Sequence, residues 1–379
     1  MPRENPFVLL EDRLAGRVRH YERPLELLTA WEPSEVDRVL DRMEALKKAG
    51  RELAGYFAYE LGYVLEPKLA PLLPTERRVP LIRFAAFEGH DQRDLPAAKA
   101  QPKVTSLTPA WTREEYVARF RRVIEYIHAG DVYQINLTFP QYGRLEGDPV
   151  SLYAALRARQ PVAHGGMVAL GEETIVSLSP ELFFDLSDNV LRSRPMKGTA
   201  RRGLAPLEDM MIARDLKEDE KQRAENLMIV DLLRNDIGRL SKIGSVRVPD
   251  LFTVETYPTL HQMTSTVQGE MNTDLSIRDV LVGLFPCGSV TGAPKIRAME
   301  IIRELETAPR GVYCGGIGRI SPDGSMHFNV AIRTLTVFPD NAFTLNVGSG
   351  LVADSRAVSE YDECLLKARF LTGSSMTSA

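Results

Sequence analysis

Strand-like runs follow one another in the middle of this sequence, rather than alternating with helical patterns. They are rich in β-branched and aromatic residues, a composition typical of strands. Strands that follow one another directly in the sequence usually pair as antiparallel hairpins, because parallel pairing needs a long crossover connection between the strands, usually a helix. These runs therefore favour an α+β fold with antiparallel sheets. The runs begin at Val132, Gly166, Thr174 and Glu181, and further ones occur near 317–320, 327–337 and 342–347.

Helical periodicity marks the segments that we expect to lie against these sheets. Residues 34–50 carry apolar side chains at helical spacing, with Ser34 as a favourable N-cap and Gly50 as a stop. Residues 112–130 have acids in the first turn and end at Gly130. Further helices are predicted for about 218–240, from Pro294 onward and for about 358–370.

The composition changes after residue 88 and divides the chain into three parts. Residues 1–88 mix strand-like runs with one helix, and we expect this N-terminal region to pack on the remainder. Residues 89–110 are polar and rich in proline and alanine, which is typical of a linker or a long surface loop. Residues 111–372 contain the seven motifs described below and are expected to form the catalytic domain.

Charge and cysteine content exclude several functional classes. The 379 residues include 47 basic and 51 acidic side chains and no long basic block, so the pattern of a nucleic-acid-binding protein is missing. The three cysteines, Cys287, Cys314 and Cys364, are an odd and sparse set without CxxC or Cys/His spacing, which argues against a zinc site or a disulfide framework. The sequence shows no signal-peptide layout, and no apolar run approaches the roughly 20 residues of a membrane span. We therefore expect a cytoplasmic protein without a nucleic-acid or membrane partner.

Lys197 stands among four permanent cations, at 192, 194, 201 and 202. A lysine with its ordinary pKa of about 10.4 is protonated at neutral pH and cannot act as a nucleophile. Burial and neighbouring cations both lower the pKa of a lysine. The stretch therefore predicts either a nucleophilic amine, tuned by those arginines that face inward, or an ordinary solvated charge in a basic loop.

Two kinds of acid suggest catalysis. Glu181 precedes the apolar strand residues Leu182–Phe184, where burial would raise its pKa as a general acid requires, although an edge-strand charge is an alternative. Glu225 begins an apolar helical run, and Glu360 and Glu363 share one face of another helix. These three carboxylates suit Mg²⁺, which prefers a few oxygen ligands. The alternative is a boundary acid and a solvated helix face.

Two glycine-containing stretches suggest an anionic substrate. Residues 288–294 lead into a helix, whose N-terminal N–H groups can bind an anion. Gly348 and Gly350 are predicted to follow a strand and to let the backbone approach a ligand closely. Together with Arg333, predicted in a strand, they indicate a substrate with carboxylate groups.

Seven motifs resemble those of the chorismate-utilising enzyme family, which includes anthranilate, aminodeoxychorismate, isochorismate and salicylate synthases. The resemblance is close from about 111 to 370 and loose over 1–88, and it implies large antiparallel sheets packed as a sandwich core with helices outside. In chain order the motifs are S-P-E181, P-M-K-G-T199, R-A-E-N-L-M-I-V-D-L-L-R-N-D236, H261-Q-M-T-S-T, F-P-C-G-S-V-T-G-A-P-K295, G-V-Y313-C-G-G and G-S-G-L-V-A-D354.

Two positions indicate the branch of the family. Aminodeoxychorismate synthases resemble this chain in having a nucleophilic lysine at the position of Lys197, where anthranilate synthases have alanine. Isochorismate- and salicylate-forming relatives have a water-activating lysine at the position of Gln134. The resemblance is therefore closest to component I of the aminodeoxychorismate synthases. Component I of anthranilate synthase and a non-catalytic chorismate-binding subunit are the alternatives.

The resemblance implies amination of chorismate at C4, giving 4-amino-4-deoxychorismate for p-aminobenzoate and folate synthesis. Glu181 would protonate the departing hydroxyl, Lys197 would form a covalent adduct at C2, and ammonia would displace the lysine. Mg²⁺ would be held by Glu225, Glu360 and Glu363. The substrate-binding residues would be Gly198, Thr199, His261, Thr291, Gly292, Tyr313, Arg333, Gly348, Ser349, Gly350 and Lys367.

The source of ammonia and the regulation also follow from the resemblance. The chain has no glutaminase nucleophile motif, so we expect either free ammonia or a separate glutamine amidotransferase subunit as the nitrogen source. Pyruvate elimination would need another protein, because little sequence follows Phe370. Feedback-regulated relatives have L-L-E-S near the N-terminus for tryptophan, whereas this chain has Leu9–Asp12 as L-L-E-D, which puts tryptophan binding in doubt.

Overall fold

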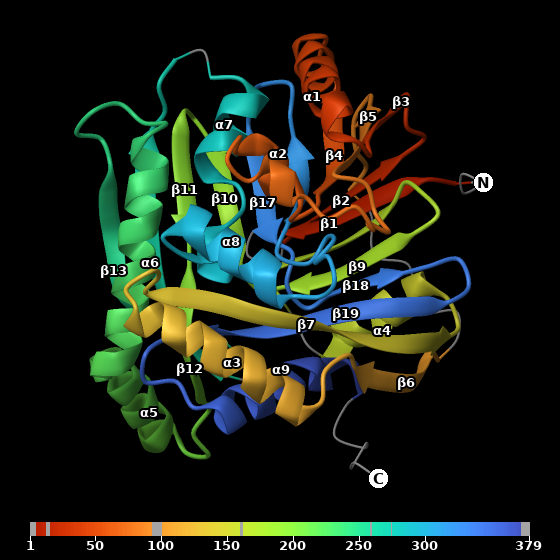
Figure 1. The fold of residues 1–379 in the computed structure, drawn as a ribbon. Coiled ribbons are helices and arrows are strands. Elements are labelled where there is room, and N and C mark those ends of the chain that lie inside the picture. Colours follow the sequence, from red (N-terminus) through yellow and green to blue (C-terminus); the bar gives the residue numbers. More distant parts are fainter. Residues whose placement is uncertain are drawn as a thin grey trace.

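Two large antiparallel sheets pack face to face, and helices lie outside them (Figure 1). The computed structural model of the protein describes residues 5–12, 16–92, 101–159, 162–257, 260–273 and 275–372. The arrangement confirms the predicted α+β fold with a sandwich core.

The first sheet has nine strands, in the order β15-β7-β19-β18-β9-β8-β1-β2, with β6 beside β7. Its strands are β1 (Phe7–Asp12), β2 (Arg17–Glu22), β6 (Lys103–Pro109), β7 (Gln134–Glu146), β8 (His164–Ala169), β9 (Thr174–Ser179), β15 (Gly292–Ala293), β18 (Thr334–Val337) and β19 (Ala342–Leu351).

The second sheet has ten strands, in the order β12-β14-β11-β10-β17-β16-β4-β5-β3, with β13 beside β14. Its strands are β3 (Glu26–Ala30), β4 (Glu52–Phe57), β5 (Ile82–Phe87), β10 (Leu182–Ser187), β11 (Val190–Arg194), β12 (Met196–Arg201), β13 (Arg247–Thr256), β14 (Leu260–Glu270), β16 (Gly316–Ile320) and β17 (Met326–Val330).

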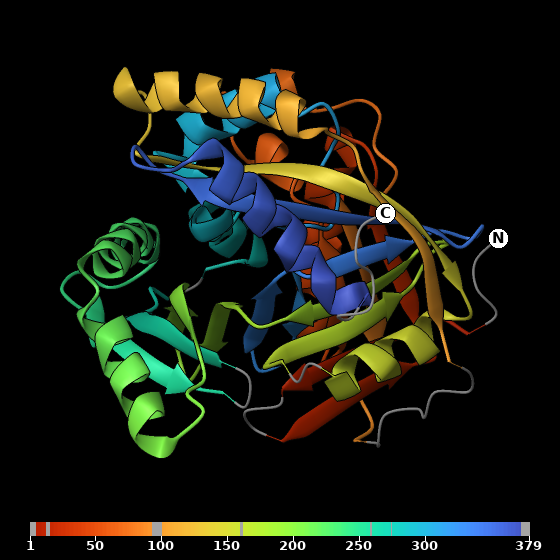
Figure 2. The same ribbon diagram turned by 90° about the horizontal axis from the view of Figure 1, so that it is seen from below.

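The helices divide between the two sheets. Helices α3, α4 and α9 pack on the first sheet, whereas α1 and α6 pack on the second. Figure 2 shows α5 and α6 (green) together at one side of the molecule, apart from α3 and α9 (orange and blue). The helices are α1 (Pro33–Lys48), α2 (Leu61–Leu65), α3 (Arg113–His128), α4 (Pro149–Arg159), α5 (Pro206–Glu218), α6 (Glu220–Gly238), α7 (Ile277–Leu284), α8 (Lys295–Leu305) and α9 (Ala357–Thr372), with 3₁₀ turns η1 (Ala70–Leu72) and η2 (Gly288–Val290).

The core between the sheets is made of the inward-facing side chains of both. Val168 and Ile175 come from the first sheet, and Tyr56, Phe87 and Ile317 from the second, and all are almost fully buried. In a β-sandwich, alternate side chains of each strand point inward and fill the space between the two sheets in this way. No helix of the described residues is long and apolar enough to cross a membrane.

Two predicted helices show how local sequence sets their ends. Helix α3 begins after Thr112, whose hydroxyl accepts a hydrogen bond from the N–H of Glu115, as a capping box requires. Helix α1 has Glu32 rather than the predicted Ser34 at its N-cap, because Pro33 occupies the first helical position and Glu35 completes the capping box.

The N-terminal region and the predicted linker contribute to both sheets. Residues 1–88 provide β1 and β2 to the first sheet and β3, β4 and β5 to the second. Of the predicted linker, 93–100 lie outside the described residues, while 103–109 form β6. This part is a strand because Val104 and Leu107 are half-buried and the backbone pairs with β7.

Candidate active site

Lys197 lies on β12, a strand at the edge of the second sheet, and not in a loop as predicted. The pairing of β12 with β14 shifts register between Met196 and Thr199. Gly198 lies at this shift with a φ of +75°, in the left-handed region that glycine tolerates best. Its carbonyl oxygen accepts a hydrogen bond from the side-chain amide of Gln262 at 2.8 Å. The irregularity therefore lies directly beside Lys197.

The amine of Lys197 reaches the first sheet at Gly350. A Cβ atom placed on Gly350 would lie 3.4 Å from the Lys197 Nζ and 3.1 Å from the Gln134 Nε2. Gly348 and Gly350 lie within β19, paired with β7, and not after a strand as predicted. The missing side chain at 350 thus leaves room for the amine between the two sheets.

Burial is the main reason that the pKa of Lys197 is lowered, and the nearby Lys367 lowers it further. Glu225, Glu181 and Glu363 oppose this shift. These charges come from α6, α9 and the residue before β10, so the fold gathers side chains that are far apart in the sequence around one amine.

The four arginines near Lys197 are all paired with acids, and none of them is among the groups that shift its pKa most. An arginine whose charge is neutralised by an adjacent carboxylate has little net effect on the pKa of a third group. The pairs are Arg192–Asp185 at 3.8 Å, Arg194–Glu255, Arg201–Glu208 at 2.6 Å and Arg202–Asp209 at 2.7 Å.

Glu181 is buried immediately before β10, with 6% of its surface exposed. The Ser289 hydroxyl donates a hydrogen bond to its Oε1 at 2.8 Å. Burial raises the pKa of Glu181 to about 7, although the Ser289 hydrogen bond and the charge of Lys197 act in the opposite direction. A carboxyl group with this pKa is largely protonated in mildly acidic solution and can donate a proton.

Three predicted magnesium ligands come from two helices, Glu225 from α6 and Glu360 and Glu363 from α9. Burial raises the pKa of Glu225, Lys197 and Lys221 oppose this, and Asp354 and Glu360 add to it. Mutual repulsion of carboxylates is the electrostatic condition that a divalent cation relieves, so the donor chemistry fits Mg²⁺.

The same carboxylates also have partners within the protein. The Ser355 hydroxyl donates to Glu360 at 2.8 Å, and Glu363 forms an ion pair with Lys367 at 2.7 Å. Within the described part of the chain, no three His, Cys, Asp or Glu side chains are close enough to form a ready-made metal site. Side-chain rotation would have to precede metal binding.

Arg333 and Lys367 are the two cations predicted to bind an anionic substrate. Arg333 lies between β17 and β18, where the chain crosses from one sheet to the other, and its φ is +49°. It is therefore not inside a strand as predicted. Its pKa is lowered by burial, and among the described residues no carboxylate forms an ion pair with it. The Lys367 Nζ donates to the Gly348 carbonyl oxygen at 2.8 Å.

The glycine-containing loop before α8 is hydrogen-bonded to β7. The Asn136 N–H donates to the Thr291 carbonyl oxygen at 2.9 Å, and Gly292 pairs with Ile135. Gly292 has a φ of +147°, and a Cβ there would overlap the carbonyl of Gln134. The Thr291 N–H donates to the Gly288 carbonyl, so fewer N–H groups remain for an anion than the sequence predicts.

Four other predicted substrate residues have partners away from the Lys197 amine. His261 lines a cavity of about 410 Å³ beside α5. Its Nε2 lies 2.8 Å from the Asp209 carboxylate and its Nδ1 3.0 Å from the Thr256 hydroxyl. Thr199 is exposed, and its hydroxyl donates to the Gln262 side chain at 3.0 Å. Ser349 is buried, and its hydroxyl lies 3.3 Å from the Tyr116 hydroxyl. Tyr313 is buried in the turn before β16, where it packs in the hydrophobic core.

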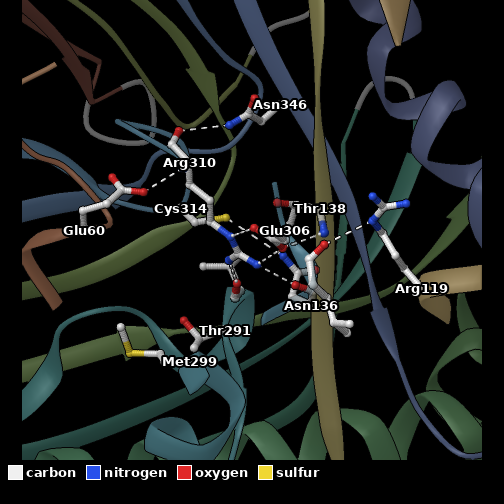
Figure 3. Close-up of polar contacts among 12 residues, drawn as sticks. Glu60, Arg119, Asn136, Thr138, Thr291, Met299, Glu306, Arg310, Cys314 and Asn346 are labelled. Carbon is white, nitrogen blue, oxygen red and sulfur yellow. Dashed lines mark hydrogen bonds and ion pairs between the residues drawn. The ribbon is translucent and has the colours of Figure 1, made fainter. Parts of the chain in front are cut away.

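A buried ion pair between Arg310 and Glu306 lies close to Asn136 and Thr138 of β7 (Figure 3). Arg310 pairs with Glu306 at 2.6 Å and donates to the carbonyl oxygens of Asn136 at 2.6 Å and Val290 at 2.9 Å. The Thr138 N–H donates to Glu306 at 2.9 Å. The pair thus joins β7, η2 and the segment after α8, which places the loop that contains Ser289 and Thr291.

Sequence reasoning missed four residues that contribute to this region. Glu306 and Arg310 stand four residues apart, a spacing from which an ion pair could have been predicted. Lys221, which forms an ion pair with Asp354 at 2.9 Å, stands four residues before Glu225 on the same helix face. Ser289 lies within a recognised motif, but its contact with Glu181 joins positions 108 residues apart.

Comparison with protein families matches residues 5–373 to the chorismate binding enzyme model. The chain belongs to the chorismate binding enzyme family. This chorismate-binding enzyme is 44% identical over 262 residues to aminodeoxychorismate synthase component 1 of Klebsiella aerogenes, a match that covers 68% of the chain and 58% of the relative. It is 38% identical over 366 residues to the protein of that name from Escherichia coli K12, covering 88% and 81%.

Among solved structures, the chorismate-binding enzyme resembles anthranilate synthase component I from Streptococcus pneumoniae TIGR4, with a TM-score of 0.79 and 26% identity. That match covers 98% of this chain and 93% of the other. The match to the Klebsiella relative spans less than two thirds of that protein's length. The recognised family and its fold are therefore those that the seven motifs predict.

Proposed function

We propose that this enzyme aminates chorismate at C4, converting chorismate and ammonia into 4-amino-4-deoxychorismate and water. The observation that carries the proposal is the electrostatic interaction between a half-buried lysine and a buried acid. The pKa of Lys197 is lowered by burial, while the pKa of Glu181 is raised to about 7. Opposite shifts of this kind favour a neutral nucleophile beside a protonated acid. The names of the Klebsiella and Escherichia relatives support the same reaction.

The reaction balances with these two groups. Glu181 gives its proton to the C4 hydroxyl, the C4–O bond breaks, and the oxygen leaves as water. The Lys197 nitrogen forms a bond to C2 as the two ring double bonds each shift by one position toward C4. Ammonia then bonds to C4, both double bonds shift back, and the C2–N bond breaks to release Lys197. The proton lost by the new amino group returns Glu181 to its acid form.

The cations account for substrate binding in this proposal. Chorismate has two carboxylates, and the guanidinium of Arg333 has no acid paired with it in the described chain. One substrate carboxylate would bind Arg333 near Tyr313 and the Gly348–Gly350 segment, with Lys367 assisting. An unpaired buried guanidinium gains most from a carboxylate, which matches its planar donor geometry.

Magnesium belongs to the proposal because of the carboxylates on α6 and α9. Glu225 and Glu363 would hold the ion, with Glu360 close by, and the bound ion would neutralise the second carboxylate of the substrate. Burial raises the pKa of Glu225, and the repulsion by Asp354 and Glu360 that adds to this shift supports the assignment. The protein's own part is to present these oxygens opposite the Lys197 amine.

A second component would supply ammonia. The relatives are named component 1, which supports a partner, and we propose that the partner is a glutamine amidotransferase. The product would serve p-aminobenzoate and folate synthesis in the cytoplasm, after pyruvate elimination by another enzyme.

Anthranilate synthesis is the second candidate, favoured by the similarity to the Streptococcus pneumoniae structure. It would place the amino group at C2 and release pyruvate from this chain alone. The test is to incubate the purified chain with chorismate, Mg²⁺ and ammonium, with and without an aminodeoxychorismate lyase, and to identify products by mass spectrometry. We expect 4-amino-4-deoxychorismate, and p-aminobenzoate only with the lyase. Formation of anthranilate would overturn the proposal.

A further inference from the structure

The hydrogen bond between Ser289 and Glu181 joins the two sheets at the proposed site. Glu181 comes from the residue before β10, and Ser289 from the 3₁₀ turn η2, which leads into β15. Both side chains are buried, with 7% of Ser289 and 6% of Glu181 exposed. Water is therefore a poor competitor for the hydrogen bond, and the carboxyl group has a fixed neighbour on one oxygen.

The Cys287 thiol can extend this hydrogen bond, because it lies next to the Ser289 hydroxyl. Its Sγ lies 3.2 Å from the Ser289 Oγ, and the thiol is 2% exposed. Burial raises the pKa of Cys287 to about 12, so the thiol keeps its proton and can donate to Ser289. A serine hydroxyl that accepts from the thiol directs its own hydrogen at Glu181. The result is a chain of donors from Cys287 through Ser289 to the Glu181 Oε1.

The rest of η2 is held firmly enough to make Ser289 a fixed donor. The Thr291 hydroxyl donates to the Cys287 carbonyl at 2.8 Å, and Arg310 donates to the Val290 carbonyl at 2.9 Å. On the other side, the Ser179 hydroxyl accepts the N–H of Glu181 at 3.2 Å. Both ends of the Ser289–Glu181 contact are therefore anchored to neighbouring backbone.

We propose that Ser289 is a positioning residue for proton transfer: its hydroxyl occupies the Glu181 Oε1 and leaves Oε2 as the oxygen that carries the transferred proton. This inference rests on the proposed function, in which Glu181 protonates the departing hydroxyl. In that step the Oε2–H bond breaks, a bond forms between the proton and the C4 oxygen, and water leaves. Ser289 keeps its own proton throughout.

The same contact sets the strength of the acid. A hydrogen bond donated to a carboxylate favours its charged form, so Ser289 lowers the pKa of Glu181 while burial raises it. Among the described residues, the charge of Lys197 on β12, a hydrogen bond from the Met196 backbone and the charge of Lys367 on α9 also lower its pKa. Removing the Ser289 hydroxyl therefore makes Glu181 a weaker acid and frees its carboxyl group to rotate.

The experiment compares Ser289→Ala with the wild-type chain in two measurements. The first follows the ¹³C signals of labelled glutamate carboxyl groups against pH in the free protein, with Glu181→Gln to assign the resonance. The second is the pH dependence of kcat/KM for chorismate at constant free ammonia. In Ser289→Ala we expect the Glu181 pKa and the basic limb of the profile to move upward together by about half a pH unit or more. We also expect kcat to fall roughly tenfold.

Matched variants keep the inference testable. Ser289→Thr retains the hydroxyl and should restore the wild-type pKa, while the nearly isosteric Ser289→Cys, a weaker donor, should move it upward less than alanine does. Ser193→Ala removes a different buried hydroxyl, which donates to the Phe183 carbonyl, and should leave the Glu181 pKa unchanged. An unchanged Glu181 pKa in both the Ala and Cys variants would overturn the inference. If Ser289→Ala shifts the Glu181 pKa but the wild-type chain makes no aminated product, the proposed function is rejected. The role of the Ser289–Glu181 contact in setting the pKa is still supported in that case.

Discussion

Gly350 faces the amine of Lys197 so closely that a single methyl group would touch it, since a Cβ at 350 would lie 3.4 Å from Nζ. The same Cβ would lie 3.1 Å from the Gln134 amide nitrogen, which is tighter than ordinary van der Waals contact. We predict that Gly350→Ala lowers kcat/KM for chorismate by tenfold or more, because small displacements of reacting groups are costly. The cost in folding stability should be only about 1 kcal/mol.

Steady-state kinetics and denaturant unfolding check the Gly350 prediction. Gly89→Ala is the matched control, since a Cβ at Gly89 meets no atom within 4 Å and its backbone is not in the left-handed region. Wild-type kinetics in Gly350→Ala would show that the space at 350 is not used by the reaction.

Lys197→Ala should abolish C4 amination, because no other described amine lies at Gly350. Burial lowers the pKa of Lys197, so the wild-type rate should rise with pH as the amine loses its proton and should fall above about pH 7 as Glu181 ionises. The check is a pH–rate profile together with intact-protein mass spectrometry in the absence of ammonia. An undiminished rate in Lys197→Ala would contradict the nucleophilic role, as would a failure to trap an adduct on residue 197.

Glu181 should also make the folded protein less stable as pH rises. Its pKa is about 7 when folded, against 4.5 for an ordinary glutamate, so the folded state binds more protons between these two values. Stability is therefore lost progressively as pH rises from about 4.5 to 7, by up to about 3 kcal/mol. We predict that Glu181→Gln, which cannot ionise, gains stability relative to the wild type between about pH 5 and pH 8.

Thermal or denaturant unfolding of the wild type and Glu181→Gln, each at about pH 5 and about pH 8, measures this difference in stability. Glu60 also has a pKa raised to about 7 by burial, but it is present in both proteins and its contribution cancels in the comparison. A stability difference between wild type and Glu181→Gln that does not change with pH would show that Glu181 is not ionising in this range.

The sequence predicts the elements that local signals define. A helix is predicted to start at Thr112, and α3 begins there, while the run around Glu225 is a helix that buries Val230, Leu233 and Ile237. Helix α5 escaped prediction because it is amphipathic only weakly, with Leu216 as its one buried residue. The run 327–337 is predicted as one strand, because both of its halves are apolar and buried. It is in fact divided between β17 and β18, since the chain changes sheets near Arg333.

The site was predictable in its residue types but not in its pairings. Glu181 and Lys197 could be singled out as an acid and an amine from their neighbours in the sequence. The arginine pairs could not, because Arg194 meets Glu255 on a different strand and thus loses its influence on Lys197. Strand β12 itself depends on pairing with β14, some 60 residues away, and no local periodicity encodes that contact.

Breaking the buried pair of Arg310 and Glu306 should destabilise the protein strongly. Arg310→Met would leave Glu306 and two backbone carbonyls without their donor, a change that typically costs about 3–5 kcal/mol. The double variant Arg310→Met with Glu306→Met removes the stranded charge, so we predict that it is more stable than Arg310→Met alone. Denaturant unfolding of both single variants and the double variant gives the coupling energy. Additive effects would contradict a direct pair.

Glu225→Gln should weaken Mg²⁺ binding, because it removes a partly buried carboxylate whose repulsion by Asp354 and Glu360 a cation would relieve. We predict that Mg²⁺ raises the melting temperature of the wild-type protein in the presence of chorismate and has little effect on Glu225→Gln. Electron paramagnetic resonance of Mn²⁺ as a magnesium substitute measures binding directly, without relying on turnover. Glu218→Gln, an exposed acid at the end of α5, is the matched control and should bind Mn²⁺ as the wild type does. Equal Mn²⁺ affinity in Glu225→Gln and Glu218→Gln would remove Glu225 from the metal site and shift the assignment to the acids of α9.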